Sequence, residues 1–158
     1  MATWASDNPL KRQQAPLEVR TALLRALVET IGDDRLELVQ DLSSPWAIET
    51  LRRAARRWPD RPLVFVVGSD LVAQIPRWRE AREVLRCCRL AIAPRRGWPL
   101  RQADLVRIRS LGGVPEILPL DIPATASSEV RQQPDPDLVP KELWPVLLEH
   151  NLYGLTPP

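Results

Sequence analysis

Leu63-Val-Phe-Val-Val-Gly-Ser-Asp70 is the stretch that decides the fold, a run of five apolar residues that ends in a polar turn. A continuous apolar run of this length is typical of a β-strand covered on both faces of a parallel sheet. A helical pattern from Pro76 to about Arg89, which carries Trp78, follows the turn. A second short strand at 90–93 then leads into Pro94-Arg-Arg-Gly-Trp-Pro-Leu100. Each strand delivers the chain to a turn-prone polar cluster, where α/β domains build ligand crevices.

The same alternation of helices and strands extends to both sides of this stretch. Pro16 opens a helix that Gly32 terminates, and Ser44 with Pro45 forms an N-cap and first-turn pair for the next helix. Further elements are expected as strands at 36–39 and 114–118 and as helices at 99–111 and 140–149. Strict alternation predicts an α/β domain with a Rossmann-like parallel sheet and helices on both faces. Residues 1–158 are expected to form one such domain.

Composition narrows the possible partners of the chain. With 158 residues and a formal net charge of +2, electrostatics gives little reason to expect nucleic acid. Lys11 and Lys141 are the only lysines among 22 basic residues, and this arginine excess fits either a phosphate-binding surface or an arginine-biased genome. No apolar run approaches the ~20 residues of a membrane span, and the first residues lack a signal-peptide pattern, so no membrane partner is expected.

The two cysteines, Cys87 and Cys88, are adjacent. Zinc sites need spaced ligands, so this pair does not form one, and no metal ligands are expected elsewhere. Cys88 is interpreted as a small core residue. Reduced cysteines fit a cytoplasmic protein.

Several turns carry groups suited to a ligand. Gly68 lets a ligand approach the backbone, and Asp70 can accept hydrogen bonds from ribose hydroxyls, although a plain helix cap explains it equally well. Trp78 either stacks on an aromatic ring or belongs to the core. Arg95, at the end of the second strand, suits a phosphate or carboxylate, or is simply solvated. The segment from Thr125 to Arg131 suits an anion, or is a capping box.

Catalytic sets that can be recognised from sequence are missing. The only histidine, His150, lies near the C-terminus without a nucleophile beside it. Neither a Gly-x-x-x-x-Gly-Lys-Ser/Thr loop nor a Gly-x-Gly-x-x-Gly turn occurs. The residues alone therefore predict a domain with several anion- and ribose-suited turns on one side of its sheet.

Read together and in order, these turns resemble the bacterial nicotinate-nucleotide adenylyltransferases of the nucleotidyltransferase superfamily. Asn8-Pro-Leu-Lys11 is similar to the family's Pro-x-x-Pro-x-Lys loop, and Arg20 to the arginine at the start of its next helix. Trp46-Ala-Ile-Glu-Thr-Leu51 resembles Tyr-Thr-Ile-Asp-Thr-Leu. Four further segments match the family at plausible spacings: Gly68-Ser-Asp70 with Trp78, Arg95-Arg-Gly-Trp-Pro-Leu100, Thr125–Arg131 and His150-Asn-Leu-Tyr-Gly154.

The resemblance implies an enzyme of NAD biosynthesis. It would transfer the adenylyl group of ATP, with Mg²⁺, to nicotinate mononucleotide, and release pyrophosphate. The pyridine nucleotide is assigned to Trp46, Ala47, Gly68, Asp70, Trp78 and Arg95, and ATP to Lys11, Arg20, Ser127, Ser128 and Arg131. Preference between nicotinate and nicotinamide forms, and the oligomeric state, do not follow from the sequence.

Two departures from the family matter. Ala126 stands where the nucleotide-binding motif has its first serine. The family's Gly-Gly-Thr-Phe-Asp-Pro and His-x-Gly-His motifs are also absent, so no catalytic residue is assigned. The chain is expected to be an incomplete, impaired product that lacks the first strand and first helix of the family fold. The alternatives are a non-catalytic nucleotide-binding relative and an adenylyltransferase with another acceptor, such as a pantetheine phosphate.

Overall fold

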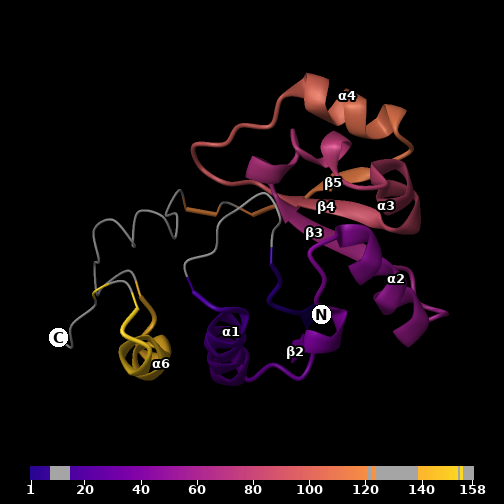
Figure 1. Ribbon diagram of the computed structural model, residues 1–158. Helices are drawn as coiled ribbons and strands as arrows, with labels where there is room; N and C mark the ends of the chain where they lie inside the picture. Colours follow the sequence, from indigo (N-terminus) through magenta and orange to yellow (C-terminus); the bar gives the residue numbers. More distant parts are fainter. Residues whose placement is uncertain (8–14, 121, 124–138, 153, 155–158) are drawn as a thin grey trace. The chain divides into compact units, whose positions relative to one another are not determined.

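The computed structural model describes residues 1–7, 15–120, 122–123, 139–152 and 154. The chain divides into two compact units, one made of Met1–Pro45 with Thr125–Pro158 and the other of Trp46–Ala124. All strand pairs in both units are parallel, and helices connect the strands (Figure 1). The predicted α/β class is therefore confirmed.

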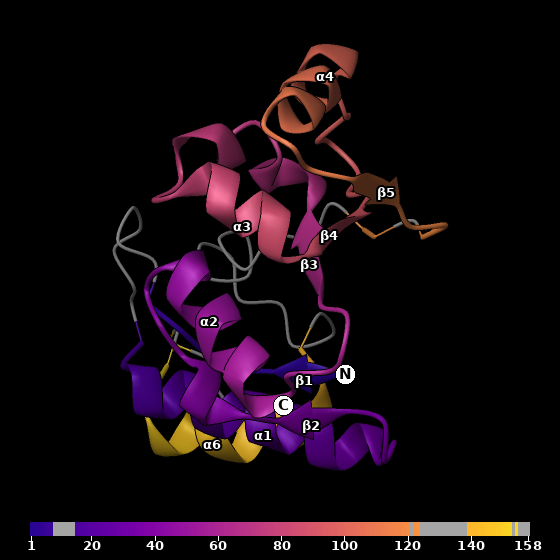
Figure 2. The same cartoon turned by 90° about the vertical axis from the view of Figure 1, so that its right-hand side faces the viewer.

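In the first unit a short parallel ladder lies beside a long helix. β1 (Ala2–Thr3) pairs with β2 (Glu37–Leu38), and α1 (Leu17–Ile31) connects them. Gly32 ends α1 in the left-handed conformation, at φ 60°, and its N–H donates to the Val28 carbonyl, as the sequence predicts. The C-terminal elements, a 3₁₀ turn at Lys141–Leu143 and α6 (Trp144–Glu149), lie alongside α1 (Figures 1 and 2).

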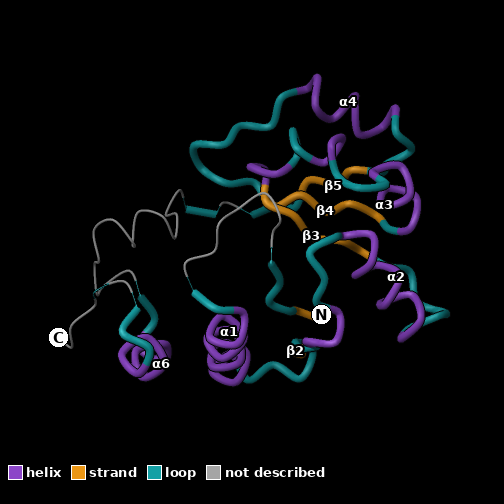
Figure 3. Tube along the Cα trace, viewed as in Figure 1, coloured by secondary structure: helices purple, strands orange, loops and turns teal. Residues whose placement is uncertain are grey.

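The second unit is a three-stranded parallel sheet with the order β3–β4–β5, drawn as adjacent orange tubes in Figure 3. Its helices and strands in chain order are α2 (Ala47–Arg57), β3 (Val64–Gly68), α3 (Ala81–Cys87), β4 (Arg89–Ala93), α4 (Gln102–Ser110) and β5 (Pro115–Ile117). Two 3₁₀ turns, Ser69–Leu71 and Ile75–Arg77, lie between β3 and α3. Both crossovers step in the same direction along the sheet, so right-handed connections put α3 and α4 on the same face.

The main core of this unit lies between that face and the helices. Phe65 and Val67 of β3 stand opposite Leu90 and Ile92 of β4 in the ladder. These side chains pack against apolar residues of the 3₁₀ turns, α3 and α4. The buried members of this cluster are Val67, Val72, Ile75, Leu85, Leu90, Ile92, Leu105 and Ile108.

The opposite face differs between the two long strands. In β4 both faces are buried, as expected for a central parallel strand. In β3, Val64 and Val66 remain 53% and 50% exposed, so the expectation that the apolar run is covered on both faces is wrong for this strand. The reason is position: β3 is the edge strand of the described sheet, and its even-numbered side chains point away from the helix-covered face.

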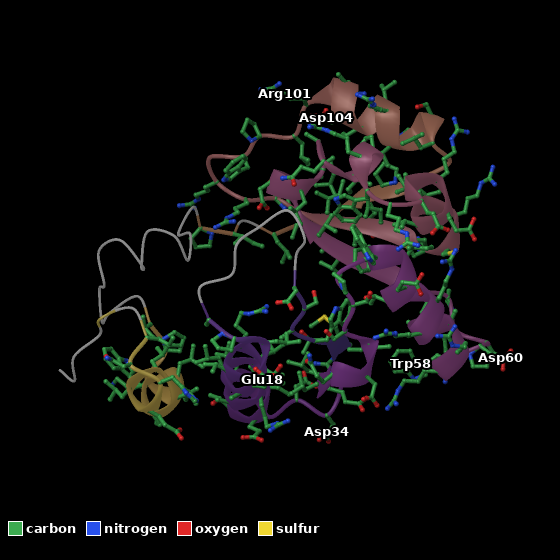
Figure 4. All side chains as sticks on the ribbon, viewed as in Figure 1. Glu18, Asp34, Trp58, Asp60, Arg101 and Asp104 are labelled. Atoms are coloured by element: carbon green, nitrogen blue, oxygen red, sulfur yellow. The ribbon has the colours of Figure 1, made fainter. Side chains whose placement is uncertain are left out.

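Four helix starts also differ from the sequence predictions, and the last of them is that of α6, expected at 140 but found at Trp144 after a 3₁₀ turn. The second helix begins at Ala47 after Trp46, without a side-chain cap, rather than at Ser44–Pro45. The helix expected from Pro76 begins only at Ala81. The helix expected from Pro99, α4, begins after Arg101, whose carbonyl accepts the Asp104 N–H at 3.0 Å. Figure 4 labels both residues beside α4. Proline favours a first helical turn, and here the chain instead remains extended or forms a 3₁₀ turn before each helix.

Candidate functional site

The two polar clusters that follow β3 and β4 meet at one edge of the sheet. Gly68 and Ala93, the last residues of these strands, stand opposite each other in the ladder. Just beyond them, the buried Ser69 hydroxyl accepts a hydrogen bond from the Arg95 N–H at 3.0 Å and donates one to the Trp98 carbonyl at 2.8 Å. Carboxyl ends of adjacent parallel strands always share an edge, so the predicted convergence of Gly68, Asp70 and Arg95 is present in the structure.

Asp70 lies back over Gly68 and faces Arg95. A Cβ atom added to Gly68 would lie 2.3 Å from Asp70 Oδ1, so any larger residue at this position would push the carboxylate out of its present place. The other oxygen, Oδ2, lies 3.6 Å from Arg95 Nη1. The Asp70 and Arg95 side chains are 20% and 23% exposed, so a carboxylate and a guanidinium lie next to each other, partly shielded from solvent, at the carboxyl ends of β3 and β4. The close approach expected of a ligand at Gly68 is made here by Asp70.

Trp78 lies in a turn rather than on a helix. Its N–H donates to the Ile75 carbonyl at 3.0 Å, its backbone is extended, and α3 begins three residues later. The ring packs against the main core and meets Phe65 edge to face, with the centroids 6.3 Å apart. Trp78 as a whole is partly buried, so it anchors the core without being fully enclosed by it.

Trp46 and Ala47 stand at the start of α2. Ala47 packs against a second buried cluster, Ile48, Leu51, Val84 and Cys88, which Trp78 also contacts. Trp46 is 36% exposed, and the guanidinium of Arg79 lies over its ring, 5.6 Å from the centroid. The structure thus brings the three pyridine-nucleotide candidates Trp46, Ala47 and Trp78 to adjoining positions around α2 and the turn before α3.

An ion-pair network that the sequence analysis did not identify supports this turn. Arg52 of α2 donates to Glu80 at 2.6 Å and to Glu49 at 3.0 Å. The hydrogen bond that Arg52 donates to Glu80 raises the pKa of Arg52, and the weaker one that it donates to Glu49 acts in the same direction. The i, i+3 spacing of Glu49 and Arg52 is a sequence signal for one pair. Glu80 is 28 residues away from Arg52, so only the fold makes the other pair.

Arg20, an ATP candidate, lies in the first unit and ties together two stretches of chain. Its guanidinium donates to the carbonyls of Ala15, at 3.1 Å, and Ser6, at 2.7 Å, and pairs with the Asp7 carboxylate. These contacts join the residues that precede positions 8–14 in the sequence to the residues that follow them, and Lys11 is one of the positions between. The other ATP candidates, Lys11, Ser127, Ser128 and Arg131, and the Thr125–Arg131 segment lie outside the described residues.

The two cysteines and the histidine are not placed as an activated nucleophile or a paired base. Burial raises the pKa of the Cys88 thiol to about 11, and burial with the Glu83 charge raises that of Cys87. His150 closes α6, where its N–H donates to the Val146 carbonyl at 3.2 Å. Within the described ranges, no three His, Cys, Asp or Glu side chains gather as a metal site would require, and no helix is long and apolar enough to cross a membrane. The described groups suit binding and charge placement.

Comparisons with known proteins agree with this architecture. The chain is 34% identical over 168 residues to the probable nicotinate-nucleotide adenylyltransferase of Synechocystis, covering 97% of the chain and 84% of the relative. It is 30% identical to the protein of the same name in Myxococcus xanthus, covering 98% of the chain and 77% of the relative. A search with protein-family models found no match.

A solved structure shares the fold. The Plasmodium falciparum nicotinic acid mononucleotide adenylyltransferase, solved in complex with NaAD, superposes with a TM-score of 0.72 over 97% of this chain and 82% of that one. At 15% sequence identity, this likeness concerns the fold alone.

Proposed function

The chain belongs to the nicotinate-nucleotide adenylyltransferase family, and we propose that it transfers the adenylyl group of ATP to nicotinate mononucleotide. An oxygen of the mononucleotide phosphate bonds to the α-phosphorus of ATP. The bond from that phosphorus to the oxygen that bridges to the β-phosphorus breaks, and pyrophosphate leaves with the electron pair. The products are nicotinate adenine dinucleotide and pyrophosphate. Such a transfer requires positioning and charge stabilisation rather than a covalent enzyme intermediate.

The observation that carries this proposal for the site is the meeting of the Gly68–Asp70 turn with Arg95 at one sheet edge, joined by Ser69. This edge combines a carboxylate that can accept ribose hydroxyls with a guanidinium that can bind a phosphate. A nucleoside monophosphate presents both groups a few bonds apart. The edge therefore suits the ribose and phosphate of the acceptor nucleotide.

The aromatic part of the acceptor is assigned to the neighbouring surface. Trp78, which is only partly buried, is assigned to stacking, and Trp46 and Ala47 border it at the start of α2. When the nucleotide binds, we expect Asp70 to exchange its 3.6 Å contact with Arg95 for ribose hydroxyls and the Arg95 guanidinium to bind the phosphate. The same acid and base thus serve both halves of one ligand.

ATP is assigned to groups of the other unit. Arg20 is proposed to act there, with Lys11, Ser127, Ser128 and Arg131 as further contacts to the triphosphate. Mg²⁺ is proposed to arrive bound to the phosphates of ATP, because Mg²⁺ usually binds to substrate phosphates and not to a site made of protein ligands alone. The reaction is proposed to take place in the cytoplasm, where cysteines such as Cys87 and Cys88 stay reduced.

Purified protein, incubated with nicotinate mononucleotide, ATP and Mg²⁺, tests the proposal. Chromatography is expected to show nicotinate adenine dinucleotide and pyrophosphate in equal amounts, and chelation of Mg²⁺ is expected to stop their formation. Exchange of Asp70 for Asn or of Arg95 for Gln is expected to raise the KM for the mononucleotide more than the KM for ATP. Parallel reactions contain a pantetheine phosphate in place of nicotinate mononucleotide. Product formed only in these reactions would identify an adenylyltransferase with another acceptor.

The outcomes separate the alternatives. If no dinucleotide forms but calorimetry shows that the mononucleotide and ATP both bind, the chain acts as a nucleotide-binding relative without turnover. Binding of neither nucleotide would remove the proposed function altogether. Equal turnover with a pantetheine phosphate would contradict the assignment of the Trp46–Trp78 surface to a pyridine ring.

A further inference from the structure

The turn Trp78-Arg79-Glu80 is held in an uncommon conformation by α2. Glu80 has a φ of 53°, a left-handed backbone that residues with a Cβ adopt only when their surroundings impose it. The constraint is visible: Glu80 Oε2 accepts a hydrogen bond from Arg52 Nη2 at 2.6 Å. Arg52 is fixed in turn by Glu49, one turn earlier on the same helix.

Arg79 precedes Glu80 in the chain and contacts the start of α2. Its guanidinium lies over the Trp46 ring, 5.6 Å from the centroid. Trp46 is the N-cap of α2, and Glu80 is bound to Arg52 of the same helix. The cation–π contact therefore lies beside an ion pair that joins the same turn to the same helix.

The charge of Arg79 is available to a ligand. Among the described residues, its one carboxylate contact runs from Nε to Glu80 Oε1 at 3.6 Å, and Glu80 gives its shorter contact to Arg52. No described residue takes the two Nη groups of Arg79, and the side chain is 53% exposed. The guanidinium thus presents unused N–H donors beside an aromatic ring, in the fork geometry that matches a carboxylate.

We propose that Arg79 recognises the ring carboxylate of the pyridine nucleotide and makes the site selective for the nicotinate form over the nicotinamide form. This inference rests on the proposed function and adds a specificity-determining residue to it. The two mononucleotides differ only in this ring substituent, an anion in one and a neutral amide in the other. A guanidinium forms a bidentate ion pair with the carboxylate alone, while the neutral amide offers it a single oxygen acceptor and no opposite charge, so the discrimination falls on this contact.

The other basic candidate near the site fits this role less well. Arg95 lies at the end of β4, with Asp70 at 3.6 Å, at the position assigned to ribose and phosphate. Arg79 directly follows Trp78, the ring assigned to stacking, and itself lies over Trp46. A substituent on a pyridine ring that contacts these tryptophans therefore meets Arg79.

Calorimetric titration of four proteins with each mononucleotide tests the proposal. They are the unchanged chain, Arg79→Gln, Arg79→Lys, and Arg82→Gln as the matched control. Arg82 is exposed on α3 and lies three residues further along the chain. Circular dichroism checks that all four are folded.

Arg79→Gln is expected to weaken binding of the nicotinate form roughly tenfold and to leave the nicotinamide form within about twofold. Arg79→Lys is expected to keep part of the preference, because it retains the charge and loses the fork. Arg82→Gln is expected to bind both as the unchanged chain does. The preference of the unchanged chain is expected to shrink between about 0.05 M and 0.5 M salt, since Arg79 is half exposed.

An unchanged ratio of the two affinities in Arg79→Gln would overturn the proposal, whether both affinities stay the same or fall together. Failure of the unchanged chain to bind either mononucleotide would overturn the proposed function and this inference with it. If the unchanged chain and Arg79→Gln bind the nicotinate form equally well, the proposed function stands and only the role of Arg79 is removed.

Discussion

Ser69 and Arg95 are joined by a hydrogen bond, from the Arg95 N–H to the Ser69 hydroxyl at 3.0 Å, that links the ends of β3 and β4. The same hydroxyl donates to the Trp98 carbonyl at 2.8 Å. One buried side chain therefore satisfies two backbone groups that lie beyond the ladder. The candidate site depends on this link, because it sets Arg95 across from Asp70.

Removal of the Ser69 hydroxyl is expected to destabilise the fold and loosen the site. Ser69→Ala leaves the Arg95 N–H and the Trp98 carbonyl without their partner, which costs about 1–3 kcal/mol of unfolding free energy. Urea denaturation measures the change. Ser110→Ala is the control, because that hydroxyl bonds only to the Arg107 carbonyl at the exposed end of α4 and its loss is expected to cost under about 0.5 kcal/mol. Equal losses in both variants would contradict the linking role.

Trp78 is expected to contribute to stability and binding at once. Trp78→Ala removes a ring that packs against both buried clusters, so the unfolding free energy is expected to fall by about 2–4 kcal/mol. Trp78→Phe keeps an aromatic face and is expected to retain most of the affinity for the mononucleotide. Trp98→Ala, at a tryptophan that is 52% exposed, is the stability control. If Trp78→Ala binds the nucleotide normally at a temperature where it is folded, Trp78 is a core residue only.

Arg20 is expected to hold the chain on both sides of residues 8–14. Arg20→Ala removes contacts with Ser6, Asp7 and Ala15, and a loss of about 1–3 kcal/mol is expected in thermal or urea unfolding. Arg25→Ala, an exposed arginine on α1, is the control and is expected to change stability by under about 0.5 kcal/mol. If Arg20→Lys raises the KM for ATP and leaves kcat unchanged, Arg20 also takes part in ATP binding. If Arg20→Ala is as stable as the unchanged protein, Arg20 does not hold the chain together as predicted.

Stability is expected to fall in alkaline solution because of Cys88. Burial raises its pKa from 9.0 to about 11, so the unfolded chain loses the proton first as pH rises. The stabilisation is complete below pH 9 and is lost between pH 9 and about 11, with a slope of at most about 1.4 kcal/mol per pH unit for one proton. Unfolding at a series of pH values measures this slope. Cys88→Ala is expected to flatten it and Cys87→Ser to retain most of it, and a slope unchanged in Cys88→Ala would assign it to another group.

Many elements of both units could be predicted from local patterns. The apolar run at 63–67, the short strand at 90–93 and the closing Gly32 each follow from side-chain periodicity or from backbone preference, and each is present. The convergence of Gly68 and Arg95 also follows from the sequence, since parallel neighbouring strands end at the same edge. What local patterns missed are the helix starts at Ala47 and Ala81. There, the chain before each helix is not α-helical, although proline favours a first helical turn.

The sequence by itself determined the order of strands and helices, the polar turn after each strand and, through that order, the family of the chain. It could do so because apolar periodicity and turn residues act over a few neighbours, and the family is recognised by motifs in a row. Only the tertiary structure decided which charges meet. The pairing of Arg52 with Glu80, the placement of Arg79 over Trp46 and the fold of Asp70 back over Gly68 join residues by their positions in space. Periodicity carries no signal for such contacts, because their energies depend on distances that exist only once the chain has packed.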